Sequence, residues 1–236
     1  MKAIITAAGM GTRIAQNIAG KHKCTLDISD GTPLICYTVK TLLALGIGDI
    51  SVIVGYRRQE IETVLEDTPV KIYCNPFYYL TNSIGSLYFA RQEFDGSSNI
   101  LIMNGDTFVE RALYEAICSH AASPLLVVDS SRKNVADVKV HVENRLVTHY
   151  GKEIAATVTA ESTDIVKVNR EHTVVYREML ERMLDQRYHD KYWEDVLMAE
   201  NGKLPVNALD TNGLFWSEID FIEDYARVMG FTGRQV

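Results

Sequence analysis

The chain has few cysteines and lacks the long apolar segments of secreted or membrane proteins. Among its 236 residues are four cysteines, widely scattered and without a C-x-x-C pair. This argues against a zinc site and a disulfide framework, and favours reduced core cysteines. No apolar run approaches the roughly 20 residues of a membrane span, and the N-terminal segment lacks a signal-peptide layout. We therefore expect a cytoplasmic protein that does not bind membranes.

Positive charge is also scarce, and catalytic histidine patterns are missing. The formal net charge of −7 argues against broad binding to nucleic acid or to an acidic membrane surface. Any anionic substrate must therefore be held by locally placed cations. The 6 histidines are spread without pattern, so the sequence offers no convincing Ser-His-Asp or Cys-His set. A hydrophobic content of 47% can fill the core of one α/β domain.

The most informative stretch that is present follows the apolar run Lys2–Thr6. Residues 7–13 read Ala-Ala-Gly-Met-Gly-Thr-Arg. Two glycines one residue apart let the backbone turn sharply and present amide N–H groups to a ligand. Thr12 adds a hydroxyl donor, and Arg13 adds a planar charged fork that suits phosphate oxygens. This loop predicts a site for a nucleoside triphosphate.

Two better-known phosphate loops do not fit this stretch. A dinucleotide fingerprint needs a third glycine where Ile14 stands, and a P-loop needs a Gly-Lys-Ser/Thr sequence that is missing. A simple Gly-rich turn between strand and helix is the alternative interpretation. The basic residues Lys21 and Lys23 downstream argue against it.

Short β-rich runs alternate with helical patterns in the first half of the chain, which is typical of a parallel sheet with right-handed crossovers. Strands are expected at Lys2–Thr6, Ser51–Val54, Val70–Cys74 and Ile100–Met103. Helices are expected at Leu34–Leu45, Gln59–Leu65, Ser86–Phe94 and Glu110–Ala121. The pattern predicts an α/β fold with a Rossmann-like sheet that is mixed but mainly parallel and is flanked by helices.

From Leu125 onward the strands become closely spaced. Strands are expected at Leu125–Val128, Val138–Val142, Leu146–Thr148, Thr163–Val168 and Leu204–Ala208, and helices at Arg170–Leu184 and Phe221–Met229. The second and third of these strands read as a hairpin with one polar face. We expect a single domain over residues 1–236, with a nucleotide-binding half (1–122) and an acceptor-binding half (123–236) that contains a small β-rich subregion.

Carboxylates at two distant positions suggest a metal site. Asp106 follows the expected strand Ile100–Met103, at the sheet edge where α/β proteins bind their ligands. Glu218 and Asp220 lie on one face of an extended segment before the last helix. Mg²⁺ takes one or two carboxylates together with substrate phosphates and waters, so Asp106 and Asp220 would suffice, with Glu218 as a more distant or alternate ligand. Helix capping is the alternative role for both aspartates.

These motifs recur in the order of a known family. The chain resembles the nucleotidyltransferases that activate sugar phosphates and small phospho-alcohols, which open with A-A-G-x-G-T-R followed by Pro-Lys about ten residues later. Lys23 keeps the family's spacing from Gly11, although His22 stands where the family usually has proline. Gly105-Asp106 and Glu218-Ile219-Asp220 also recur. The resemblance implies a nucleotide-diphospho-sugar transferase fold.

Segments 81–87, 192–195 and 216–220 are similar to the small cytidylyltransferases that act on phosphocholine or on phosphonates such as 2-aminoethylphosphonate. The implied reaction is attack of an acceptor oxygen on the α-phosphorus of CTP, with release of pyrophosphate. A phosphate acceptor is mostly ionised at pH 7, because its second pKa is near 6, so no protein base is needed. Catalysis then consists of positioning and charge neutralisation by Arg13, Lys23 and Mg²⁺.

The resemblance implies two sets of contacts. The nucleotide-binding set is Ala7, Ala8, Gly9, Met10, Gly11, Thr12, Arg13, Lys23, Gly55, Asn82, Ser86 and Asp106. The acceptor-binding set is Lys139, Lys152, Tyr192, Trp193, Asp195 and Trp216. Aromatic faces suit a choline-type cation, whereas Glu194 and Asp195 suit a primary amine, and both alternatives stay open here.

The expected partners are CTP and a small anionic acceptor, without nucleic acid or membrane, and a homodimer is one candidate assembly. A transferase for sugar-1-phosphates is the second hypothesis, although such an acceptor needs many hydroxyl partners. A regulator that binds nucleotide without turnover is a third hypothesis of a different class. Such a regulator would be expected to lose Lys23 or a metal carboxylate, and the chain keeps Lys23, Asp106 and Asp220.

Overall fold

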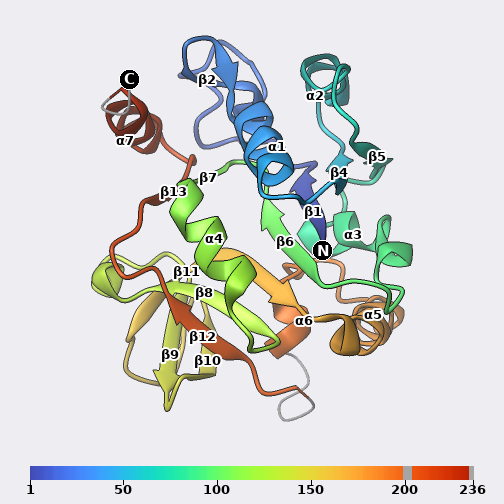
Figure 1. Ribbon diagram of the computed structural model, residues 1–236, viewed down its shortest axis with the longest axis vertical. Coiled ribbons are helices and arrows are strands. Elements are labelled where there is room, and N and C mark those ends of the chain that lie inside the picture. The colour runs from blue at the N-terminus through green and yellow to red at the C-terminus, as the bar shows by residue number, and fades with distance from the viewer. Residues whose placement is uncertain (199–203, 234–236) are drawn as a thin grey trace.

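The computed structural model describes residues 1–198 and 204–233, and it places a mixed sheet between two layers of helices (Figure 1). In spatial order the strands of this sheet are β5 (Lys71–Cys74), β4 (Asp49–Val54), β1 (Lys2–Ala7), β6 (Ile100–Asn104), β11 (Ala160–Val168), β8 (Leu125–Asp129), β12 (Asn207–Asp210), β10 (Leu146–Gly151) and β9 (Lys139–Glu143). The expected α/β fold with a mixed sheet is confirmed.

Parallel pairing is concentrated in the first half of the chain. Strands β5, β4, β1 and β6 pair in parallel, whereas β11 runs antiparallel to both β6 and β8. The register pairs Thr6 of β1 with Asn104 of β6. The loop after β1 and the loop after β6 therefore leave the sheet at the same edge, where parallel strands collect ligands.

Helices cover both faces of the sheet, as the sequence patterns predicted. One face carries α1 (Leu34–Ala44), α2 (Arg58–Val64) and α4 (Arg111–Ser119), and the other carries α3 (Ser83–Tyr88), α5 (Arg170–Asp185) and α6 (Asp195–Met198). The last helix, α7 (Ile222–Thr232), packs near the short pair β2 (Asp27–Ser29) and β3 (Thr32–Pro33). Three short helical turns are η1 (Lys23–Thr25), η2 (Arg91–Glu93) and η3 (Ser130–Arg132).

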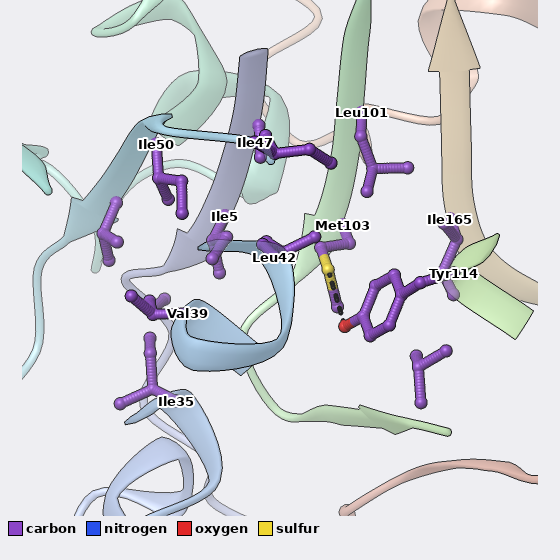
Figure 2. Packing of buried hydrophobic residues seen from close by; sticks show 14 of the residues in the cluster. Ile5, Ile35, Val39, Leu42, Ile47, Ile50, Leu101, Met103, Tyr114 and Ile165 are labelled. Atoms are coloured by element: carbon purple, nitrogen blue, oxygen red, sulfur yellow. Dashed lines mark hydrogen bonds between the residues drawn. The ribbon is translucent and has the colours of Figure 1, made fainter. Parts of the chain in front are cut away.

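The core under α1 and α4 fixes the strands that lead to the site. Figure 2 shows Val39 and Leu42 of α1 near Ile5 of β1, and the Tyr114 ring of α4 next to Met103 of β6. The Tyr114 hydroxyl lies 3.4 Å from the Met103 sulfur. Burying each such side chain contributes about 1.5–3 kcal/mol, so the ends of β1 and β6 are held firmly.

Several element boundaries differ from the sequence expectation: β10 extends to Gly151, β11 begins at Ala160 and α7 extends to Thr232. The helix expected at Ser86–Phe94 begins instead at Ser83, because the Asn82 side chain accepts a hydrogen bond from the Ser83 N–H at 2.8 Å and caps it. The late strand runs over Asn207–Asp210 rather than Leu204–Ala208. Within the described part of the chain, no helix has both the length and the apolar character needed to cross a membrane.

Candidate functional site

A cavity of about 570 Å³ opens at the edge of the sheet where β1 and β6 end. Its wall contains these members of the predicted nucleotide-binding set: Ala7, Ala8, Gly9, Met10, Gly11, Thr12, Arg13, Lys23, Asn82, Ser86 and Asp106. Gly55 lies outside this wall and supports the loop from behind. A Cβ atom on Gly55 would approach the Ala8 carbonyl oxygen to 2.9 Å, so only glycine fits there.

The glycine-rich loop depends on a left-handed backbone at Gly11. Its φ of +58° is readily adopted by glycine and disfavoured for other residues. A Cβ atom at this position would also lie 3.2 Å from Cδ of Lys23. Gly11 therefore sets the turn and leaves room for the Lys23 side chain to pass beneath it.

Lys23 joins the two ends of the chain. Its ammonium nitrogen forms ion pairs with Asp106 and with Asp220, the latter at 3.0 Å. Burial lowers the pKa of Lys23, but the charges of Asp106 and Asp220 raise it by more, so its pKa lies well above its ordinary value. Arg13 pairs with the second oxygen of Asp220. Two cations thus stand beside the cavity.

Three acids converge next to these cations. One ligand oxygen from each of Asp106, Glu218 and Asp220 lies within 4.8 Å of the others. The antiparallel pair β7 (Thr107–Val109) and β13 (Trp216–Glu218) brings them together, and it places Glu218 opposite Thr107. Burial, followed by the nearby charge of Asp106, raises the pKa of Glu218 well above its usual value.

This acid cluster fits a divalent cation. The buried Oδ1 of Asp106 has no hydrogen-bond partner among the described residues, and hard oxygen donors are the ligands that Mg²⁺ prefers. Neither aspartate serves as a helix cap. The N-cap of α4 is Glu110, and the first turn of α7 is capped by Asp224, whose carboxylate accepts from the Phe221 N–H at 2.9 Å.

His22 reproduces the backbone that the family builds with proline. Its φ of −73° lies in the proline range, while its N–H donates to Glu60 at 2.8 Å, a bond that proline cannot make. Its Nδ1 accepts from the Cys24 N–H at 3.2 Å, which caps η1 next to Lys23. The pKa of His22 is lowered, chiefly by burial. The ring thus holds the segment that carries the lysine.

The predicted acceptor-binding residues divide into two groups. Lys152, Tyr192 and Asp195 line the cavity, and Lys152 pairs with Asp137. Lys139, Trp193 and Trp216 lie outside its wall.

The indole N–H of Trp193 donates to Asn104 at 3.0 Å, and that of Trp216 donates to Asp129 at 2.8 Å. Both rings are buried in the core, and Lys139 pairs with the exposed Glu153 at 3.0 Å. The aromatic faces expected from the tryptophans are therefore used in packing.

Other residues on the cavity wall did not emerge from the sequence. Asp164 and Asp137 line the cavity, and neither belongs to a recognisable motif. Asp164 ends the polar stretch Glu161–Asp164 of β11, in which Glu161 is a second, buried acid. No sequence signal therefore separates Asp164 from its polar neighbours.

The fold, the glycine-rich loop with its two cations and the three-acid cluster define a nucleotidyltransferase. The chain belongs to the family with a MobA-like NTP transferase domain, whose match covers residues 3–203. It is 24% identical over 237 residues to the choline-phosphate cytidylyltransferase of Streptococcus pneumoniae, covering 97% of this chain and 96% of that protein.

A further protein and a solved structure that are similar to this chain are also named cytidylyltransferases. Over 89 residues, the chain is 36% identical to the 2-aminoethylphosphonate cytidylyltransferase of Lancefieldella rimae, covering 37% of this chain and 36% of that one. Among solved structures, the CTP:phosphocholine cytidylyltransferase from Streptococcus pneumoniae superposes with a TM-score of 0.76 at 21% identity, covering 98% of both chains. At this identity the superposition establishes the fold.

Proposed function

We propose that this protein transfers CMP from CTP to a small phosphonate or phospho-amine acceptor and releases pyrophosphate. The observation that carries the proposal is the meeting of Lys23 and Arg13 with the acids Asp106 and Asp220 on one cavity wall. The names of the similar proteins, which act on choline phosphate and 2-aminoethylphosphonate, support CTP and this acceptor class.

In the proposed reaction an ionised acceptor oxygen attacks the α-phosphorus of CTP. A new P–O bond forms, the bond from the α-phosphorus to the bridging oxygen breaks, and pyrophosphate leaves with that electron pair. The acceptor arrives deprotonated, so the protein holds no proton for this step. Its task is to bring two anions together, which costs electrostatic free energy unless cations offset their repulsion.

Arg13 and Lys23 provide the positive charge that offsets this repulsion. The guanidinium of Arg13 presents paired N–H donors that match phosphate oxygens, whereas the Lys23 ammonium acts as a buried point charge. Nucleotide oxygens would compete with Asp220 and Asp106 for these two cations. The candidates for reading the base are the backbone of Ala7 and Ala8 and the side chains of Asn82 and Ser86, which all lie on the cavity wall.

Asp106 and Asp220 would hold a Mg²⁺ ion, with Glu218 as the alternate ligand. When bound, Mg²⁺ neutralises phosphate charge and orients the oxygens.

The four cysteines are free thiols, which suits the reducing cytoplasm that we infer for this protein.

The test is a matrix of CTP, UTP, GTP and dTTP against phosphocholine, 2-aminoethylphosphonate, 2-hydroxyethylphosphonate and glucose-1-phosphate. Pyrophosphate release is the readout. We expect release with CTP and an acceptor that carries a phosphonate or phospho-amine. Turnover only with glucose-1-phosphate would favour the sugar transferase. Nucleotide binding without release would favour the regulator.

A further inference from the structure

Two cavity acids are not used by the proposed phosphate chemistry. Asp164 of β11 and Glu194, which precedes α6, both line the cavity. Glu194 is only 3% exposed, and its Oε2 has no hydrogen-bond partner among the described residues. A buried carboxylate oxygen without a partner is costly, because it has lost its water and gained nothing in return. This arrangement calls for a hydrogen-bond donor from a ligand.

The position of Glu194 is fixed by its neighbour Trp193. The Trp193 N–H donates to the Ser83 hydroxyl at 3.0 Å, its carbonyl accepts from the Tyr176 hydroxyl at 2.9 Å, and its indole N–H donates to Asn104 at 3.0 Å. The Trp193 ring is completely buried. A residue anchored at three points cannot shift easily, so Glu194 stays at the cavity wall.

Asp164 reaches the same wall through an irregular backbone. Its φ is +55°, at a break in the pairing between β11 and β8. The Ser162 hydroxyl donates to one Asp164 oxygen at 2.8 Å. Burial, and then the nearby charge of Asp106, raises the pKa of Asp164 to about 7. Burial and the charge of Asp164 likewise raise the pKa of Glu194.

The two acids therefore form an acidic subsite. The charge of Lys152 lowers the pKa of Asp164, but the salt bridge of Lys152 is with Asp137. Among the described residues, no lysine or arginine forms a salt bridge with Asp164 or Glu194. Within the same residues, the acids spaced to hold a metal ion are Asp106, Glu218 and Asp220. The Asp164–Glu194 pair is thus left for an organic cation.

We propose that Asp164 and Glu194 bind the primary ammonium group of the acceptor, so that an aminoalkyl phosphate or phosphonate is preferred over its trimethylammonium or hydroxyl counterpart. This inference rests on the proposed function. A primary ammonium donates three hydrogen bonds, which the free carboxylate oxygens can accept. A trimethylammonium group has no N–H, so it could pack against the cavity tyrosines Tyr78, Tyr150 and Tyr192 but would leave the buried Glu194 oxygen without a donor.

The experiment compares two pairs of acceptors with the same skeleton. The first pair is 2-aminoethylphosphonate and 2-hydroxyethylphosphonate, and the second is phosphoethanolamine and phosphocholine. With CTP, we expect the wild-type kcat/KM to favour each primary amine by about a hundredfold or more, because the counterpart leaves buried carboxylates unpaired.

Glu194→Gln and Asp164→Asn test the two acids separately. Asparagine tolerates a positive φ, so the second change keeps the backbone. In each variant, kcat/KM for the amine acceptor should fall by about tenfold or more, whereas kcat/KM for the hydroxyl acceptor should stay within about twofold of the wild-type value. Glu143→Gln, at an exposed hairpin position, is the matched control and should keep the wild-type selectivity. Melting temperatures confirm that each variant is folded.

Equal loss for both acceptors would overturn the ammonium assignment, as would loss of a Mn²⁺ site in either variant. Binding of 2-aminoethylphosphonate and 2-hydroxyethylphosphonate, measured by calorimetry with a non-hydrolysable CTP analogue, separates the two proposals. Amine-selective binding that depends on Glu194 without any pyrophosphate release would contradict the proposed function and support the ammonium subsite. Pyrophosphate release without selectivity for the amine would support the proposed function and contradict the ammonium subsite.

Discussion

The ammonium nitrogen of Lys23 lies 3.0 Å from a carboxylate oxygen of Asp220, although 197 positions separate the two residues in the chain. The same nitrogen also pairs with Asp106. Lys23 therefore links the glycine-rich loop at one end of the chain with the acidic segment at the other.

Replacing Lys23 should strongly reduce turnover. Lys23→Ala is expected to lower steady-state kcat by about a hundredfold or more, because negative charge in the transition state is left without its buried cation. Lys21→Ala, which removes an exposed charge from the same segment, is the control. Near-normal turnover in Lys23→Ala would remove this residue from the mechanism.

The same lysine should weaken metal binding when no nucleotide is present. In Lys23→Met, the affinity for Mn²⁺ in the absence of nucleotide is expected to rise about tenfold, because Asp106 and Asp220 no longer have an ammonium partner. Free Mn²⁺, followed by electron paramagnetic resonance, gives the dissociation constant. An unchanged or weaker affinity, with Lys21→Met as the reference, would contradict this view of the acid cluster.

Gly11→Ala should destabilise the protein. Alanine at a φ of +58° is strained, and its Cβ would crowd the Lys23 side chain. We expect the free energy of unfolding in urea to fall by about 1 kcal/mol or more. Gly48→Ala is the matched control, because an added Cβ there meets no atom within 4 Å. A loss of equal size in both variants would show that the left-handed turn is unimportant.

His22 should make stability depend on pH. Its folded-state pKa lies below 6.5, chiefly through burial, so the unfolded chain takes up the proton more readily. Its contribution is therefore complete above about pH 6.5 and is lost as the pH falls from there toward the folded-state pKa. Urea unfolding of the wild type should weaken more steeply over this range than that of His22→Asn. Parallel curves would contradict this assignment.

Long apolar runs made much of the fold predictable. Strands β1, β4 and β6 and helix α1 fall within about two residues of the expected bounds, because burial on two faces leaves an unmistakable hydrophobic run. The strands β7 and β13, of three residues each, are too short for any periodicity to indicate. Yet that pair is what brings Glu218 and Asp220 to Asp106.

The site was predictable where its residues lie in motifs. The glycine-rich loop, Lys23 and Asp106 were expected at the nucleotide end, and all of them line the cavity. The acceptor end was harder to predict. Trp193 and Trp216 could not be distinguished from ligand-binding aromatics, because burial depends on tertiary contacts. Asp164 reaches the cavity because its own backbone is left-handed within a strand, which no sequence pattern reveals.

A crystal structure with CTP and Mn²⁺ tests the central claim most directly, because manganese scatters anomalously and can be located independently of the protein. We predict one anomalous peak coordinated by both Asp106 and Asp220 and by a phosphate oxygen, with Lys23 moved from Asp106 to the nucleotide. A peak that neither aspartate touches, or two aspartates too far apart to share an ion, would contradict the account.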